Sequence, residues 1–251
     1  MTYATEFFTD RKNTARESAS AVVPWVLDLV KPKSVVDVGC GTGSWLAEFR
    51  AQGVGELLGL DGDWVPRDGL EIPTEYFQPH DLCKMSDLGR KFDLVISLEV
   101  AEHLSCDHAN KFVDTLVGLG PLVLFSAAVP AQGGTGHINE QWPEFWIEHF
   151  KHRGYRCVDC VRGRFWKDER VAFWYSQNAF FFVAEAHIAD YPKLLDAMLN
   201  YPLAGMAVVH PQMFARKLCE LTDPNSYSLR RFLRAFPRLL KRAVLLRLGR
   251  T

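Results

Sequence analysis

Residues 34–43 of the chain read SVVDVGCGTG, and the prediction of the fold starts from them. Val35, Val36 and Val38 form a β-branched run that is typical of a buried parallel strand, and the segment SWLAEFRAQ that begins at Ser44 has the composition of a helix. The glycines between them predict a tight turn, because glycine adopts backbone conformations that are closed to other residues. A strand, such a turn and a helix predict a site where a ligand approaches the helix N-terminus.

The spacing of the glycines narrows the choice of ligand. Gly39, Gly41 and Gly43 are spaced GxGxG. A dinucleotide-binding turn has the spacing GxGxxG, which would require a third glycine where this chain has Ser44. The pattern therefore favours a nucleotide ligand other than NAD. An ordinary turn between a strand and a helix, with glycines present by chance, is the alternative interpretation.

Two acidic residues accompany the turn. Asp37 lies just before the first glycine, and Asp61 ends the next apolar run, ELLGLD, at about the 20-residue distance where a carboxylate can accept both ribose hydroxyls. Together with the glycines they resemble the class I S-adenosylmethionine (SAM) methyltransferases. The resemblance implies SAM as the cofactor, with Asp37 near its methionine moiety and Asp61 on its ribose.

Further cofactor contacts are expected from the turn and from the ends of the next strands. We expect Trp64 to lie against the adenine ring, although a tryptophan that shields the edge of the sheet is an equal alternative. The resemblance places Asp81 at the adenine amino group. The remaining residues expected to bind the cofactor are Gly39, Cys40, Gly41, Gly43, Gly62, Leu82 and Leu98.

The alternation of strand-like and helix-like segments predicts an α/β fold: a doubly wound, Rossmann-like sheet of seven strands with helices on both faces and a C-terminal helical extension. The last strand should be antiparallel, because only a hairpin-like connection, residues 161–176, precedes it. Helices are expected over 14–30, with Pro24 as a kink or boundary, 107–118 and 141–152. Strands are expected over 34–38, 56–60, 74–78, 92–98, 121–128, 155–161 and 177–184.

Length and composition suit one large globular domain with an appendage, since the chain has 251 residues, of which 48% are hydrophobic and 24% charged. We expect a methyltransferase domain over 1–189 and an extension over 190–251. In the extension, YPKLLDAMLNYP predicts a helix and VVHPQMF an extended segment closing with Pro211. The cysteines show no disulfide framework, so free thiols are expected.

Charge is distributed unevenly along the chain. All 30 acidic residues lie at or before Asp223, whereas eight of the 29 lysines and arginines follow it. The body of the chain is therefore negatively charged, and the tail after Asp223 is positively charged. The acidic body argues against an extensive nucleic-acid surface. Residues 226–251 predict a basic amphipathic helix that contacts an anionic membrane face, or else docks on the body or on a second subunit of an oligomer.

Neither a secretory signal nor a run of 18 apolar residues is present, so a cytoplasmic protein is expected, with peripheral contact at the inner membrane through the tail.

A second informative stretch supplies candidate catalytic groups. Glu99, Glu102 and His103, spaced ExxEH, follow the predicted fourth strand, and His137 lies in the loop after the fifth. Ligands of open α/β sheets bind at these strand ends. Two carboxylates and two imidazoles suit a divalent ion, with Mg²⁺ or Mn²⁺ preferred. Without a metal, His103 or His137 could act as an unaided general base, or merely pack or cap the loop.

The ExxEH segment followed by a histidine resembles metal-dependent O-methyltransferases that act on the 3′-terminal ribose of small RNAs or on catechol-like ubiquinone precursors. The segment from His137 onward resembles methyltransferases encoded among bacterial polysaccharide-biosynthesis enzymes, and its Trp142 could stack on a sugar. These resemblances imply methyl transfer to a sugar hydroxyl of a surface glycan or its precursor, with Glu102, His103 and His137 catalytic. An RNA ribose 2′-O-methyltransferase, a catechol- or quinone-type O-methyltransferase and a non-catalytic SAM-binding module remain alternatives.

Overall fold

The structure is a computed structural model, and it describes residues 5–84, 88–200 and 205–222 together with the isolated positions 233, 236, 237, 240, 241 and 247. The chain forms two compact units, Met1–Val208 and Val209–Thr251. The amphipathic helix predicted over 226–251 lies outside the described residues except at those isolated positions. The predicted domain boundary at residue 189 stays a prediction.

Within the described residues, seven strands form one sheet in the order β3-β2-β1-β4-β5-β7-β6. The first five strands along the chain pair in parallel, whereas β7 runs antiparallel to both of its neighbours. This topology confirms the predicted doubly wound sheet with an antiparallel last strand. The strands are β1 (Ser34–Val38), β2 (Glu56–Asp61), β3 (Phe77–Pro79), β4 (Leu94–Leu98), β5 (Leu122–Ser126), β6 (Tyr155–Val158) and β7 (Phe180–Ala184).

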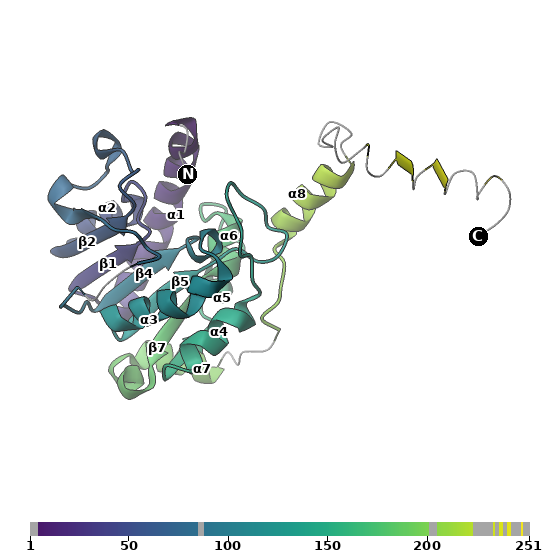
Figure 1. The fold of residues 1–251 in the computed structure, drawn as a ribbon. Helices are drawn as coiled ribbons and strands as arrows, with labels where there is room; N and C mark the ends of the chain where they lie inside the picture. Colours follow the sequence, from purple (N-terminus) through teal and green to yellow (C-terminus); the bar gives the residue numbers. More distant parts are fainter. Residues whose placement is uncertain are drawn as a thin grey trace. The chain divides into compact units, whose positions relative to one another are not determined.

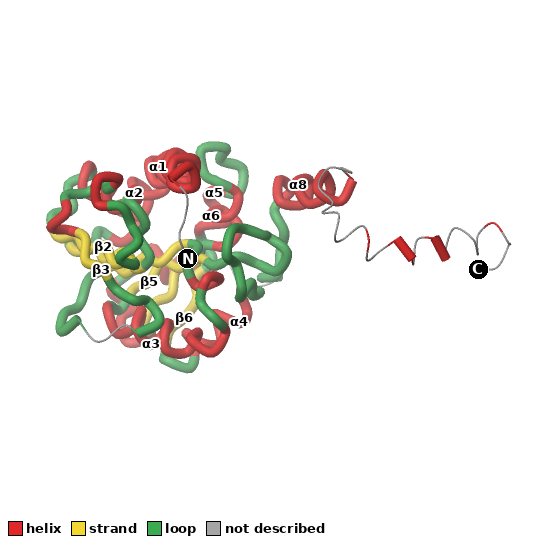
Figure 2. The backbone as a smooth tube through the Cα atoms, turned by 45° about the horizontal axis from the view of Figure 1, so that its top comes forward, coloured by secondary structure: helices red, strands yellow, loops and turns green. Residues whose placement is uncertain are grey.

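Helices cover both faces of the sheet, with α1 on one side and α3 and α4 on the other (Figures 1 and 2). The helices are α1 (Thr5–Val30), α2 (Ser44–Ala51), α3 (Ala109–Leu119), α4 (Pro143–Lys151), α5 (Val161–Phe165), α6 (Phe173–Asn178), α7 (Pro192–Asn200) and, in the second unit, α8 (Pro211–Thr222). None of the helices in the described part of the chain is both long enough and apolar enough to cross a membrane.

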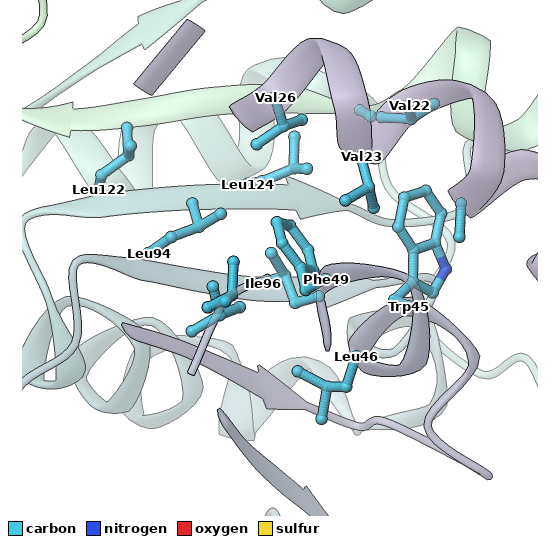
Figure 3. Close-up of a cluster of buried hydrophobic side chains, with 14 of the residues drawn as sticks. Val22, Val23, Val26, Trp45, Leu46, Phe49, Leu94, Ile96, Leu122 and Leu124 are labelled. Atoms are coloured by element: carbon cyan, nitrogen blue, oxygen red, sulfur yellow. The ribbon is translucent and has the colours of Figure 1, made fainter. Parts of the chain in front are cut away.

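Two hydrophobic clusters hold these layers together. Because successive strand residues point to opposite faces, Leu94 and Ile96 of β4 pack with α1 and α2, whereas Val95 packs with α3. Figure 3 shows the first cluster, in which Val23 of α1 and Phe49 of α2 lie over the central strands. The apolar run of each central strand is therefore buried on both faces, as a parallel sheet requires.

Three local predictions are corrected by the structure. The connection over 161–176 is not a hairpin, because α5 lies within it and α6 begins there; Val161 and Phe165, four residues apart, are both buried on the first cluster. The segment PQMF begins α8 instead of being extended, since Pro211 occupies a first helical position where no amide hydrogen is needed. Pro24 lies inside α1, so the helix does not end there; of the two expectations for this residue, the boundary is wrong and the kink stays a prediction.

The ends of two central strands define where a ligand can bind. Strand β1 lies between β2 and β4. After β1 the chain continues to β2 and β3, toward one edge of the sheet, and after β4 it continues to β5, toward the other edge. Such a switch point leaves a crevice at the carboxyl ends of the strands. A Cβ atom on Gly39 would come within 2.3 Å of Val100 Cγ2, so the turn after β1 and the segment after β4 are in close contact.

Candidate active site

The turn after β1 has the backbone that its glycines predict. Gly39, Gly41 and Gly43 have φ angles of 89°, 54° and 87°, in the left-handed region. A Cβ atom on Gly43 would lie 2.8 Å from Ile72 Cγ1, whereas one on Gly41 would meet nothing within 4 Å. The outer glycines are therefore needed for packing within the protein, and Gly41 presents bare backbone to open space.

Asp61 connects the end of β2 to this turn. Its Oδ2 accepts a hydrogen bond from the Gly41 amide at 2.7 Å, and its Oδ1 accepts one from the Gly62 amide at 2.6 Å. Burial raises the pKa of this carboxyl, and the two amide donors partly oppose that rise. The carboxylate is thus held rigidly beside the turn, and each oxygen keeps a lone pair for a ribose hydroxyl.

Asp37 is a second buried carboxyl in the same place. It lies in β1 opposite Gly59 of β2, and only 3% of the residue is exposed. Burial raises the pKa of Asp37 well above its ordinary value, and the nearby Asp61 carboxylate raises it further. Two acidic groups enclosed at neighbouring strand ends favour a positively charged ligand, because a cation offsets their mutual repulsion.

The other residues expected at the cofactor have mixed surroundings. The indole of Trp64 lies against the backbone of Gly62, since a Cβ atom there would be 2.2 Å from Trp64 Cη2, and Trp64 is 53% exposed. Asp81 is exposed and forms an ion pair with Lys84 at 3.3 Å. Cys40 and Leu82 are buried, and Leu98 is half-buried against the core.

Glu71 was missed in the sequence although it supports the turn. Its Oε1 accepts hydrogen bonds from the hydroxyls of Thr42 and Ser44 at 3.2 and 2.5 Å, and its Oε2 accepts one from Arg16 Nε of α1 at 2.8 Å. One carboxylate therefore joins α1, the glycine turn and the N-terminus of α2. It stands 27 residues after Ser44 in an irregular segment, so no local pattern marks it.

Three of the four predicted metal ligands come together after β4 and β5. A short 3₁₀ helix, Ala101–His103, carries Glu102 and His103, and His137 arrives from the loop after β5. The ring centres of His103 and His137 are 4.9 Å apart, and His137 Nε2 lies 3.9 Å from Glu102 Oε1. One ligand atom from each of the three lies within 4.8 Å of the others, which is close enough to hold a metal ion.

Glu99, the fourth predicted ligand, is engaged elsewhere. Its φ of 58° is in the left-handed region, which turns the chain sharply at the end of β4. Its carboxylate accepts hydrogen bonds from Gln132 Nε2 at 2.7 Å and Asn178 Nδ2 at 3.0 Å. The ExxEH spacing suggested one helical turn between Glu99 and His103, but this backbone separates the first glutamate from the Glu102–His103–His137 cluster.

The loop over 129–142, which carries His137, is fastened at several points. The Glu102 carbonyl oxygen accepts hydrogen bonds from the amides of Ile138 and Asn139 at 2.9 and 3.0 Å. Glu140 contacts His137 Nδ1 through its Oε1 at 3.0 Å. Glu140 was also missed, although the sequence HINE already placed an acid three residues after the histidine.

A family model described as a methyltransferase domain matches residues 10–159. Curated relatives include the tRNA U34 carboxymethyltransferases of Tolumonas auensis, 29% identical over 162 residues that make up 56% of this chain and 49% of the relative, and of Pseudomonas savastanoi pv. phaseolicola, 27% identical over 157 residues, 53% and 49% respectively. The chain spans about half the length of these curated relatives.

Solved structures with a similar fold include the methyltransferase domain of bacterial CtHen1-C. It has a TM-score of 0.50 and 16% identity, and the match covers 67% of this chain and 98% of that chain. DesVI of Streptomyces venezuelae also has a TM-score of 0.50, with 17% identity over 70% of this chain and 94% of that chain. At such identities the likeness concerns the fold alone.

Proposed function

The chain belongs to the methyltransferase domain family and is a SAM-dependent methyltransferase, and on this basis we propose that it methylates a hydroxyl of a sugar, in a bacterial surface glycan or its precursor, with the help of a divalent metal ion. The glycine turn with Asp37 and Asp61 would bind SAM, its positive charges facing the two buried carboxyls. Trp64 and Asp81 would contact the adenine.

The observation that carries this proposal is the cluster of Glu102, His103 and His137 beside the switch point. One carboxylate and two imidazoles, without a cysteine, suit a borderline divalent ion. With Glu99 held by two amides, the two imidazoles favour Mn²⁺ over Mg²⁺, although both remain candidates. A metal bound there would lower the pKa of a coordinated hydroxyl and so make it a better nucleophile.

The chain's own residues would then align the acceptor with the methyl group. The segment that carries Glu102 and His103 is in contact with the glycine turn through Val100 and Gly39, so the cluster and the cofactor site are held at a fixed separation. Correct placement is the main requirement of a methyl transfer, which is an in-line displacement. Two adjacent hydroxyls, as in a sugar, would occupy two positions of the metal and leave one hydroxyl aimed at the cofactor.

An RNA ribose hydroxyl is the second candidate acceptor. The names of the curated relatives favour RNA as the acceptor, since these proteins act on tRNA, but the names specify a carboxymethyl group at U34 and not a methyl group on ribose. The acidic body of the chain favours the glycan instead, because RNA binding depends on positive charge along the phosphate backbone. Trp142, which is 38% exposed at the end of the 129–142 loop, offers an aromatic face for a sugar ring.

Labelled SAM distinguishes the two acceptors. The purified chain would be incubated with Mn²⁺ and either a panel of oligosaccharides and sugar nucleotides or total tRNA and short RNAs. We expect label in the sugar panel, in an alkali-stable methyl ether. Label in RNA alone would support the second candidate, and label in a carboxyl ester or on nitrogen would contradict both.

We also propose that the C-terminal part of the chain contacts an anionic membrane surface. Phe214, Leu218 and Leu221 are exposed on α8 at helical spacing, and the basic tail follows. The full chain should bind vesicles of anionic lipid more strongly than a chain ending at residue 222, and added salt should reduce the difference. Equal binding of both chains would refute a role for the tail.

A further inference from the structure

His137 makes a second contact through its other ring nitrogen. Its Nδ1 lies 3.0 Å from Glu140 Oε1. The same carboxylate accepts hydrogen bonds from the amides of Gly133 and Ala131, at 2.6 and 2.8 Å. An ionised carboxylate only accepts hydrogen bonds, so the imidazole must donate to it. The proton of neutral His137 therefore resides on Nδ1.

This protonation determines what the opposite side of the ring can do. In a neutral imidazole with its proton on Nδ1, Nε2 carries a lone pair and can bind a cation. His137 Nε2 is the atom that lies 3.9 Å from Glu102 Oε1. Two ligand atoms of an octahedral ion, each at about 2.1 Å, stand about 3 Å apart when adjacent and about 4.2 Å apart when opposite. The 3.9 Å separation in the protein lies between these two values, so a single ion would contact both atoms after a small shift of either side chain.

The loop leaves the ring little freedom to turn. Only 6% of the His137 side chain is exposed. A Cβ atom on Gly134 would come within 2.2 Å of His137 Nε2, so the ring lies against the bare backbone of that glycine. Glu140 also ties the backbone of Ala131 and Gly133, and therefore fixes both the ring and the loop around it.

We infer that Glu140 is a positioning residue, which holds His137 in the Nδ1–H tautomer and thereby presents Nε2 as a metal ligand beside Glu102. The functional consequence rests on the proposed metal site. The tautomer itself does not rest on the metal site, because it follows from the contact between His137 Nδ1 and Glu140. A carboxylate that hydrogen-bonds the remote nitrogen of a ligating histidine orients the ring and increases its basicity.

Nitrogen NMR of the full-length, metal-free chain tests the tautomer. With ¹⁵N-labelled histidine at a pH where the ring is neutral, we expect a protonated, pyrrole-like signal for His137 Nδ1 and an unprotonated, pyridine-like signal for Nε2. In Glu140→Ala the populations should shift toward the Nε2–H form. A wild-type ring protonated on Nε2, or a tautomer that does not change in Glu140→Ala, would overturn the inference.

Binding of Mn²⁺, followed by electron paramagnetic resonance, tests the consequence. Glu140→Ala should weaken Mn²⁺ binding about 10- to 100-fold. Glu140→Gln should weaken it less, because its amide oxygen can still accept from Nδ1. Glu144→Gln is the matched control, since Glu144 is an exposed acid of the first turn of α4, and it should bind Mn²⁺ as the wild type does.

Stabilisation by SAM serves as the check on folding, because the glycine turn is separate from Glu140. All variants should keep the wild-type increase in melting temperature with SAM. If wild-type protein binds no Mn²⁺, the proposed metal site is wrong, and the NMR result still decides the role of Glu140. If the wild type and Glu140→Ala bind Mn²⁺ equally, Glu140 does not prepare the site.

Discussion

The amide of Gly41 donates a hydrogen bond to Asp61 Oδ2 across 2.7 Å, so the middle of the glycine turn is fixed to the residue that would bind the ribose of SAM. The contact joins the ends of β1 and β2, which are neighbours in the sheet. Contacts within the protein itself therefore hold the two parts of the nucleotide-binding motif together.

Replacing Asp61 should remove most of the affinity for SAM. The side chain of Asp61→Asn has one acceptor oxygen in place of two, so it cannot serve Gly41, Gly62 and two ribose hydroxyls together. We expect SAM affinity to fall at least about tenfold, which corresponds to about 1.4 kcal/mol, and the stabilisation seen in a thermal melt to fall with it. Asp63→Asn, at an exposed acid two residues away, should behave as the wild type. Stabilisation by NADH in place of SAM would refute the assignment.

The pH dependence of stability should report on Asp37. Because its pKa is raised well above the ordinary value of 3.8, the folded state retains this proton more strongly than the unfolded state. The stability contributed by the protonated group is complete below about pH 4 and is lost as the pH rises through the raised pKa.

Asp37→Asn, which cannot ionise, should therefore be more stable than the wild type at neutral and alkaline pH. We expect its free energy of unfolding to be higher by about 1–2 kcal/mol, and its melting temperature to be higher accordingly. The two proteins should converge toward acid pH. The variant should also bind SAM more weakly, because an amide, unlike the carboxyl of Asp37, cannot give up a proton and become negatively charged when the positively charged cofactor binds. Thermal melts across the pH range check the first result, and a constant difference at every pH would contradict it.

Alanine variants of the glycines in the turn should distinguish glycines needed for packing from a glycine needed for the approach of the ligand. In Gly39→Ala the new methyl group would meet Val100 at 2.3 Å, so we expect a large loss of stability, about 2–4 kcal/mol. In Gly41→Ala nothing lies within 4 Å, and only the cost of the left-handed backbone, about 1–2 kcal/mol, should appear.

The order of the two variants should reverse when SAM binding is measured on the folded fraction, because only Gly41 faces the space for the ligand. Denaturant melts and calorimetric titration give the two quantities. If Gly41→Ala binds SAM with wild-type affinity, the cofactor does not lie against this glycine.

The sequence was sufficient for the sheet and the turn because both depend on local patterns. Valines on both sides of Asp37 indicate a strand buried on two faces, and the glycines at 39, 41 and 43 can be recognised without knowledge of their neighbours. The close contact of Gly39 with Val100, by contrast, depends on the order of strands, which brings together residues about 60 positions apart.

The candidate site was predicted in part for the same reason. Spacing brought Glu102 and His103 into the prediction, and the neighbouring strand brought His137. The sequence could not show that Glu99 adopts a positive φ, or that its carboxylate accepts hydrogen bonds from Gln132 and Asn178. That outcome depends on a network of side chains from three separate segments. Glu71 was missed because it acts on the turn from a distant irregular segment.

Metal dependence of methyl transfer is the most direct test of the proposed chemistry. With labelled SAM and an acceptor from the sugar panel, transfer should stop after dialysis against EDTA and return when Mn²⁺ is added, while SAM binding persists throughout. Glu102→Gln should bind SAM and remain inactive with Mn²⁺ present. A vicinal diol should be methylated well and its monodeoxy analogue poorly. Full transfer in excess EDTA, with equal rates for the diol and the monodeoxy analogue, would contradict the account.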